Sequence, residues 1–404
     1  MTKMHLATSC FLVAGLTRLA TAVPSPVVER ASTCTPTAGG SSSTDDVPAI
    51  QSAIASCASG TIVIPAQQTY YINSPLSFAG CAGCTMQIEG TLKVSSDTDY
   101  WNGVQNIVEM SGITTAKVYS STGTGVIDGN GQNAWDVFAT DSSYDRPTLW
   151  SISGGSGITI QNLLFKNAPN VFHSVSGSAT GVSYIDVTLT AVSKSSNLPK
   201  NTDGWDIGAS TYVSITGAEV INDDDCVAFK PGANYVTVTD ITCTGSHGIS
   251  VGSLGSSYGT TDTVQNIYVK GATMIDSAKA AGIKLYPAGS SHGSAIVKNV
   301  TWDGIIVDNS DYAFQIQSCY NEDASYCTST PSTAQLSGIV VKNVSGTTSS
   351  TYSPTIMNLN CPAAGSCDVT MSDITVEPPS GDAEILCANT PSSIGVTCSS
   401  GASG

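Results

Sequence analysis

Residues 158–165 read ITIQNLLF, a short run whose β-branched and apolar residues are typical of a buried strand. Further runs of this kind follow along the chain, separated by Gly, Asn, Asp and Ser, the residues that favour turns. The pattern extends from about Ile113 onward, and its clearest runs begin at Ile158, Val182, Val213, Val236, Ile267, Ile296 and Ile339.

The shortest intervals between these runs define the repeat. Val182 follows Ile158 by 24 residues and Val236 follows Val213 by 23, and the longer intervals fit the same unit with an inserted loop. A strand-rich repeat of this length, without amphipathic helices, indicates a β-solenoid. We therefore predict an all-β fold of parallel strands. A β-sandwich also has many short strands, but it does not require an Ile-x-Val/Ile-x-Asn/Asp phrase to recur in phase.

One helical pattern, residues 45–55, precedes the repeat. An open solenoid end exposes unpaired strand edges, so we expect this short helix to cap the N-terminal end. Residues 34–404 are predicted to form a single domain.

The N-terminus has the pattern of a secretory signal peptide. A charged start at Lys3 leads into an apolar run over residues 6–16 and then Ala20-Thr-Ala22, which predicts cleavage after residue 22. The Pro-rich residues 23–33 suggest a propeptide or flexible arm. No later segment offers the roughly 20 apolar residues of a membrane-spanning helix. We expect a secreted, extracellular protein.

The chain has 13 cysteines, and removal of Cys10 with the signal leaves twelve. An even number in a secreted chain predicts disulfides. Zinc is disfavoured, because the C-x-x-C at Cys81 and Cys84 has no second pair or nearby histidine. Short separations favour the pairs Cys226–Cys243, Cys319–Cys327, Cys361–Cys367 and Cys387–Cys398, whereas the order among Cys34, Cys57, Cys81 and Cys84 stays open.

Acidic residues outnumber basic ones, with 31 Asp and Glu against 15 Lys and Arg, a net charge of −16. This balance argues against nucleic acid or an anionic membrane as a partner, since both bind basic surfaces. An anionic substrate would have to be held by a few local cations. The sequons at Asn299 and Asn343 predict N-glycosylation, and we expect a monomer.

Four phrases depart from the repeat: Asn201-Thr-Asp203-Gly, Asp224-Asp225-Cys226, Gly245-Ser-His247-Gly and Gly282-Ile-Lys284. Asp224 follows Asp203 by 21 residues and precedes His247 by 23, so we expect these side chains on neighbouring coils, about 4.8 Å apart. Among clustered carboxylates one stays protonated as a general acid while another activates water. Hydrolysis of a glycosidic bond needs one carboxyl group as the acid and a second as the base.

Together and in this order, the four phrases resemble the motif set of glycoside hydrolase family 28, the polygalacturonase family. The matching region covers most of the chain. The resemblance implies a right-handed, single-stranded parallel β-helix of the pectin-lyase-like type. It also implies inverting hydrolysis of α-1,4-linked galacturonan, an acidic plant cell-wall polysaccharide, with no cofactor and no metal.

Carried over by position, the resemblance also implies roles for individual residues. Asp224 would be the general acid, Asp203 and Asp225 would activate water, and His247 would orient the acid or hold its proton network. Lys284 and Tyr320 would bind substrate. Outside these motifs we interpret Asp206 as a turn residue, Trp205 as either a sugar-stacking or a core side chain, and the role of His173 as open.

One position departs from the family, which usually carries Arg-Ile-Lys where this chain has Gly282-Ile-Lys284. An arginine here could bind a substrate carboxylate through two hydrogen bonds, so its loss should weaken binding of unbranched galacturonan. Glycine should also open space for a sugar branch. The sequence around the motifs is similar to the exo-polygalacturonase and xylogalacturonan hydrolase branches, and Gly282 favours a xylose-substituted substrate. The alternatives are an exo-polygalacturonase, a pectate lyase and a non-catalytic β-helix binding protein.

Overall fold

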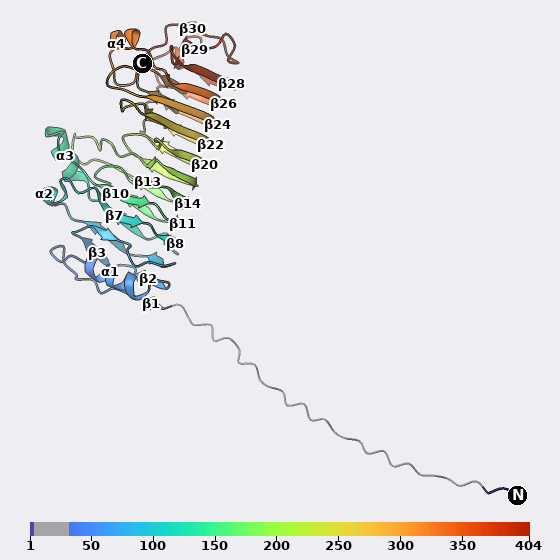
Figure 1. Ribbon diagram of the computed structural model, residues 1–404. Helices are drawn as coiled ribbons and strands as arrows, with labels where there is room; N and C mark the ends of the chain where they lie inside the picture. The colour runs from blue at the N-terminus through green and yellow to red at the C-terminus, as the bar shows by residue number, and fades with distance from the viewer. Residues whose placement is uncertain (4–31) are drawn as a thin grey trace. The chain divides into compact units, whose positions relative to one another are not determined.

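The computed structural model describes residues 1–3 and 32–404, and Ser32–Gly404 form one compact unit. The predicted signal peptide and most of the predicted arm fall on residues 4–31 and lie outside the described residues. The unit is an all-β, parallel β-helix whose strands stack coil upon coil (Figure 1). Its strand pairings are parallel throughout, as predicted.

The coils build two columns of strands that merge into one sheet. The first column contains β1 (Thr33–Cys34), β2 (Thr61–Ile64), β5 (Thr85–Ile88), β8 (Thr114–Tyr119), β11 (Ser156–Gln161), β14 (Ala179–Ile185) and β17 (Ser210–Thr216). The second contains β3 (Thr69–Ile72), β6 (Thr91–Val94), β9 (Val126–Asp128), β12 (Leu164–Lys166), β15 (Thr188–Thr190) and β18 (Glu219–Ile221). Both continue into the long strands β20 (Ala233–Thr244), β22 (Thr261–Ile275), β24 (Ser294–Ser310), β26 (Gln335–Thr348) and β28 (Ser366–Glu377).

A third column forms a separate sheet; three of the four motifs directly precede its strands, and the fourth, Gly282-Ile-Lys284, lies within one of them. It contains β4 (Leu76–Ser77), β7 (Asn106–Ser111), β10 (Thr148–Ser153), β13 (His173–Ser176), β16 (Trp205–Ile207), β19 (Val227–Phe229), β21 (Ile249–Leu254), β23 (Ala281–Leu285), β25 (Phe314–Gln317), β27 (Thr355–Asn360), β29 (Glu384–Ala388) and β30 (Ser399–Ser400).

The predicted helix is α1 (Val47–Ser56), which packs against β1 and β4 at the N-terminal end of the stack (Figure 1). Its buried face covers strand edges that would otherwise be unpaired. Three helices were not predicted: α2 (Thr98–Trp101), α3 (Gln132–Thr140) and α4 (Ala324–Ser329). No helix in the described part of the chain combines the length and the apolar character needed to cross a membrane.

The core is a stack of aligned apolar side chains. Ile158 pairs with Val182, Val182 with Val213 and Val213 with Val236, and each is at most 1% exposed. Because successive side chains of a strand alternate between its two faces, this register keeps one apolar row inside on every coil. The predicted repeat is thereby confirmed over these coils.

Two details of the predicted repeat were wrong. The ladder starts before Ile113, since β2, β5 and β8 already pair in register. The run placed at Ile296 is also four residues out of phase, because Ile267 pairs with Val300 and Val300 with Ile339. The long strand β24 contains three pairs of buried apolar residues, Ala295/Val297, Val300/Trp302 and Ile305/Val307, and Ile296 itself is exposed.

The structure contains six disulfides, four of which are the predicted local pairs. The pairing that the sequence left open is Cys34–Cys57 and Cys81–Cys84. The Cys226–Cys243 bridge is buried and ties the residue before β19 to β20. It therefore closes one coil of the β-helix beside Asp225.

The two sequon asparagines lie on the surface of the long strands. The Asn299 side-chain amide donates to Asn266 Oδ1 at 2.8 Å, and the Asn343 amide donates to Asp303 Oδ1 at 2.6 Å. Both are accessible from solvent, and their glycosylation stays a prediction.

We predict that a Cys226→Ala/Cys243→Ala variant loses stability and catalytic rate together. Removing the cross-link should lower the free energy of unfolding by about 2–4 kcal/mol, because the unfolded chain regains the freedom of a closed loop. Denaturant unfolding and kcat measure the two effects. The matched control, Cys387→Ala/Cys398→Ala at the C-terminal end, should lower stability with kcat unchanged. An equal loss of kcat in both variants would contradict a local role for the first bridge.

Candidate active site

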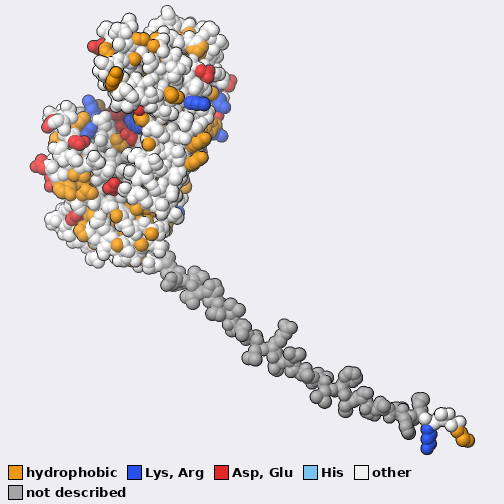
Figure 2. All heavy atoms as spheres, viewed as in Figure 1, with side chains coloured by type: hydrophobic (Ala, Val, Ile, Leu, Met, Phe, Trp, Pro, Cys, Tyr) orange, Lys and Arg blue, Asp and Glu red, His pale blue; other side chains and the backbone are white. Residues whose placement is uncertain are grey.

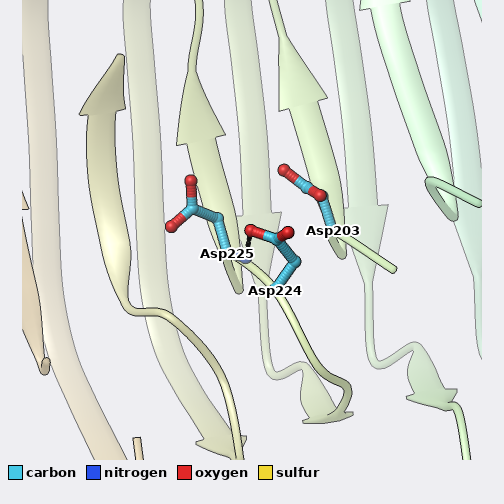
Figure 3. A group of neighbouring side chains, drawn as sticks. All are labelled: Asp203, Asp224 and Asp225. Carbon is cyan, nitrogen blue, oxygen red and sulfur yellow. Dashed lines mark hydrogen bonds between the residues drawn. The ribbon is translucent and has the colours of Figure 1, made fainter. Parts of the chain in front are cut away.

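The strand register of the third column brings the predicted carboxylates together. Trp205 pairs with Val227, and Val227 with Ile249. Asp203 and Asp225 each lie two residues before one of these paired positions, so the ladder aligns them on neighbouring coils. Figure 3 shows their side chains and that of Asp224 gathered at the start of β16 and β19.

The three carboxylates form one tight cluster. One oxygen of each of Asp203, Asp224 and Asp225 lies within 4.8 Å of the others. Asp203 is 6% exposed and Asp225 is 1% exposed, while Asp224 is half-buried. In a partly desolvated setting, ionisation of one of these neighbouring carboxyl groups opposes ionisation of another, as the charge of Asp224 does for Asp203.

Asp225 is held by an ion pair. Lys284 Nζ donates to its Oδ1 at 2.8 Å and its Oδ2 at 2.7 Å, and the Ser250 hydroxyl donates to Oδ1 at 2.9 Å. Burial opposes the charge on Lys284, but the attraction of Asp225 outweighs it and raises the pKa of the lysine. Charge-assisted bonds to both oxygens fix the orientation of the Asp225 carboxylate.

Asp224 faces His247 on the next coil, with 3.2 Å between its Oδ1 and the His247 Nδ1. The Asn201 side-chain amide donates to Asp224 Oδ2 at 3.1 Å, and the Asp225 backbone N–H donates to Asp224 Oδ1 at 2.8 Å (Figure 3). Burial acts to raise the pKa of Asp224, but the hydrogen bond and charge of His247 outweigh it and lower that pKa to about 2.

The pKa of Asp203 is shifted in the opposite direction to that of Asp224. Burial, followed by the negative charges of Asp206 and Asp224, raises its pKa well above the usual range of an aspartate. Lys230 Nζ lies 3.7 Å from Asp203 and 3.3 Å from Asp206 and only partly compensates this repulsion. The interpretation of Asp206 as a turn residue was wrong, because its carboxylate belongs to the site.

These groups line an open cavity of about 710 Å³. Acidic and basic side chains are visible in a hollow on the corresponding face (Figure 2). Tyr320, the predicted substrate-binding residue, lines the cavity with its ring centre 5.6 Å from Lys284 Nζ. His247 is close to the cluster but is not among the residues that line this cavity.

Sequence reasoning missed Lys230 and Arg146, which supply further cations to the cavity. The Arg146 guanidinium donates to Asn201 Oδ1 at 2.7 Å and lies over the Phe138 ring. Burial lowers its pKa to about 10. Arg146 thus holds the asparagine that in turn contacts Asp224. No motif marks Arg146, which lies in the segment between α3 and β10.

His173 and Trp205 belong to the core rather than to the cavity. Both are fully buried, and their rings stack with centres 5.6 Å apart at 16°. Burial alone lowers the pKa of His173 to about 3, so the ring is neutral. The open roles of these two residues are thereby settled as packing.

The expectation that Gly282 opens space was wrong. Gly282 is buried, and a Cβ atom there would clash with the Gln315 carbonyl oxygen and lie 3.0 Å from Lys279 Cδ. The volume that glycine vacates is filled by the Lys279 side chain and by the neighbouring strand β25. Gly282 therefore makes room for a neighbouring side chain and leaves no open pocket.

Asp203, Asp224 and Asp225 are also the group of described residues whose oxygens could converge on a metal ion. Lys230, Lys284 and His247 already lie beside these carboxylates at 2.7–3.7 Å. The site balances its acidic charge with its own basic side chains, and no step of the chemistry proposed below needs a metal.

Comparison with known proteins places the chain in a family. The model for glycosyl hydrolases family 28 matches residues 55–400. Endo-xylogalacturonan hydrolase A of Aspergillus tubingensis is 58% identical over 409 residues, covering 99% of this chain and 100% of that protein. A probable endo-xylogalacturonan hydrolase A of Aspergillus flavus is 60% identical over 382 residues, covering 94% of each.

Solved structures agree with this relationship. The crystal structure of the endo-xylogalacturonan hydrolase from Aspergillus tubingensis superposes with a TM-score of 0.91 at 60% identity, covering 92% of this chain and 100% of that one. A polygalacturonase from Erwinia carotovora has a TM-score of 0.69 at 18% identity, covering 91% and 99%, and shows the shared fold. The chain belongs to glycosyl hydrolase family 28 and is a glycoside hydrolase.

Proposed function

We propose that this enzyme hydrolyses internal α-1,4-galacturonosyl linkages of xylose-substituted galacturonan. The observation that carries the proposal is the cluster of Asp203, Asp224 and Asp225 at 4.8 Å or less in a cavity that also holds Lys230 and Lys284. The carboxylates supply acid–base chemistry, and the lysines suit an anionic sugar polymer. Preference for the xylosylated polymer rests on similarity to the two Aspergillus hydrolases and no longer on free space at Gly282.

In this proposal Asp224 protonates the leaving oxygen, and Asp203 and Asp225 hold and activate the water. The free enzyme has the reverse order of proton affinity, because Asp203 has the raised pKa and Asp224 the lowered one. We therefore propose that one proton is shared between Asp203 and Asp224. Its transfer from Asp203 to Asp224, across a span that one water can bridge, converts the resting state into the reactive one without net proton uptake.

His247 and Asn201 act on the acid rather than on the substrate. They contact different oxygens of Asp224, at 3.2 Å and 3.1 Å. These contacts fix the carboxylate plane and, after the proton has left, stabilise the aspartate anion. Lys284 has a double role: it orients Asp225, and it faces the cavity with Tyr320, where both can contact a sugar carboxylate or ring.

We also propose inversion at the anomeric carbon. In inverting enzymes the two carboxyl groups are usually about 6.5–9.5 Å apart, which is wider than the closest oxygens of this cluster. The proposal rests on the third carboxylate instead, since Asp203 and Asp225 together can hold one water while Asp224 acts as the acid. The Asp225 carboxylate is bound at both oxygens by Lys284, which makes it a poor nucleophile.

We propose that the protein acts outside the cell as a monomer of residues 34–404. The six disulfides of the described unit support an oxidising compartment. Residues 1–22 would direct secretion, and residues 23–33 would form a propeptide or arm.

The substrate proposal predicts that kcat/KM is about tenfold or more higher on xylogalacturonan than on unbranched polygalacturonate, the discrimination that pocket contacts can supply. Reducing-end assays and product sizing measure it, with a ladder of xylosylated oligomers as the expected product. Equal activity on the unbranched polymer would contradict the proposal. Release of small products from chain ends would indicate the exo-polygalacturonase, and unsaturated products would indicate a lyase.

Substitution of the proposed acid should abolish turnover without unfolding the protein. We expect Asp224→Asn to lower kcat about 10²–10⁴-fold, since an amide cannot deliver the proton, with KM and melting temperature little changed. The matched control is Asp240→Asn, an exposed aspartate of β20, which belongs to the other sheet than the motif strands β16, β19 and β21, and this variant should keep wild-type activity. An Asp224→Asn enzyme within tenfold of wild-type kcat would rule out this acid.

Inversion predicts that the new reducing end appears first as the β anomer, because water attacks the face opposite the α-linked leaving group. Proton NMR during the first minutes of hydrolysis distinguishes the anomers before mutarotation mixes them. An α anomer as the first product would show retention and would assign one of the three carboxylates as a nucleophile.

A further inference from the structure

Lys279 occupies an unusual place beside the active-site cluster. It lies between Ser277 and β23, and its side chain passes over two glycines of neighbouring coils. Lys279 Cδ and Cε lie 3.0 Å and 3.1 Å from the point where a Cβ of Gly282 would stand, and Cγ lies 3.0 Å from that point at Gly248. Both glycines leave the room that this lysine needs. An arginine at position 282 would compete with Lys279 for the same volume.

Lys279 is 4% exposed, and its Nζ is not among the fully enclosed polar atoms that lack a partner, so the side chain is buried while the ammonium group keeps some contact with solvent. Lys230 and Lys284 form ion pairs with the carboxylate cluster, but within residues 32–404 Lys279 forms neither an ion pair nor a side-chain hydrogen bond. A cation that is largely desolvated and has no acceptor in the protein is costly to the folded state. Such a cost at a site of chemistry indicates a group that is kept for a ligand.

The charges around Lys279 place it at the cluster. Burial and the positive charge of Lys284 lower its pKa to about 8, while Asp225 and Asp224 act in the opposite direction. Lys279 thus remains mostly protonated at neutral and acidic pH. Asp225 is already bound at both oxygens by Lys284, and Asp224 is bound by His247 and Asn201. The carboxylate oxygens of Asp224 and Asp225 are therefore already contacted by other groups.

We propose that the Lys279 ammonium group binds a carboxylate of the galacturonan substrate on the side of the cluster next to β23. This inference rests on the proposed function, because it requires a uronate polymer in the cleft. A sugar carboxylate supplies the acceptor that the protein does not, and a lysine can donate up to three hydrogen bonds to it. Gly248 and Gly282 are positioning residues, which admit the lysine stem to this place.

The test compares a substrate with and without its carboxylate charge. Initial rates are measured on xylogalacturonan and on its methyl-esterified form, for wild type, Lys279→Met and Lys279→Arg. Methionine keeps the length and apolar stem of lysine and removes the charge. We expect Lys279→Met to raise KM on the acid polymer about tenfold, the loss of one charge-assisted hydrogen bond, with kcat changed much less. On the methyl ester, the same variant and wild type should have matching KM values.

Two controls separate binding from structure. Lys270→Met, on the exposed side of β22, should match wild type on both polymers. Lys279→Arg should restore part of the affinity for the acid polymer. Because Lys279→Met removes a buried unpaired charge, its melting temperature should equal or exceed that of wild type. If the methionine variant does not fold, Lys279→Gln serves in the same comparison.

The inference is overturned if Lys279→Met keeps the wild-type KM on the acid polymer, or loses affinity equally on both polymers. It is also overturned if both neutral variants are less stable than wild type, which would show a structural role. Failure of the wild-type enzyme to cut either xylosylated polymer is a different result: it would refute the proposed function itself, whatever the variants do.

Discussion

The register of the parallel ladder between β16, β19 and β21 is the constraint on which the active site depends. Asp203, Asp225 and His247 each lie two residues before a strand whose first residues pair in line. Backbone hydrogen bonds therefore place side chains from distant parts of the sequence on adjacent coils at the spacing of neighbouring strands. A slip of one residue would turn one carboxylate toward the opposite face and leave the cluster incomplete. The buried apolar rows of every coil oppose such a slip.

The ladder also explains how an acidic protein can bind an acidic polymer. The chain has 15 Lys and Arg residues and a net charge of −16, but Arg146, Lys230 and Lys284 all line one cavity. The electric field inside a partly desolvated cleft depends mainly on the nearest charged side chains, because solvent and salt screen the charges on the distant surface. The same cations give the carboxylates different environments. Lys284 binds Asp225 in an ion pair, whereas the pKa of Asp203 stays raised. Chemistry and substrate attraction therefore share one set of side chains.

Periodic features of the fold were predictable, and features that break the period were not. The apolar rows beginning at Ile158, Val182 and Val213 repeat in phase, so their stacking followed from the sequence. The phase error at Ile296 arose in β24, where one 17-residue strand holds three successive pairs of buried apolar residues. Helix α3 and the segment carrying Arg146 have no counterpart on neighbouring coils, and repetition could not reveal that they border the cavity.

The sequence by itself determined the parallel solenoid, the grouping of Asp203 with Asp224 and Asp225, and four of the six disulfides. Each of these depends on a repeat length or a short separation, which can be read along the chain. Only the tertiary structure decided which of the carboxylates has the raised pKa and what occupies the space beside Gly282. Those outcomes depend on burial and on contacts between coils. From the sequence, glycine at position 282 predicted open space beside the site. In the structure the aliphatic part of the Lys279 side chain packs against that position.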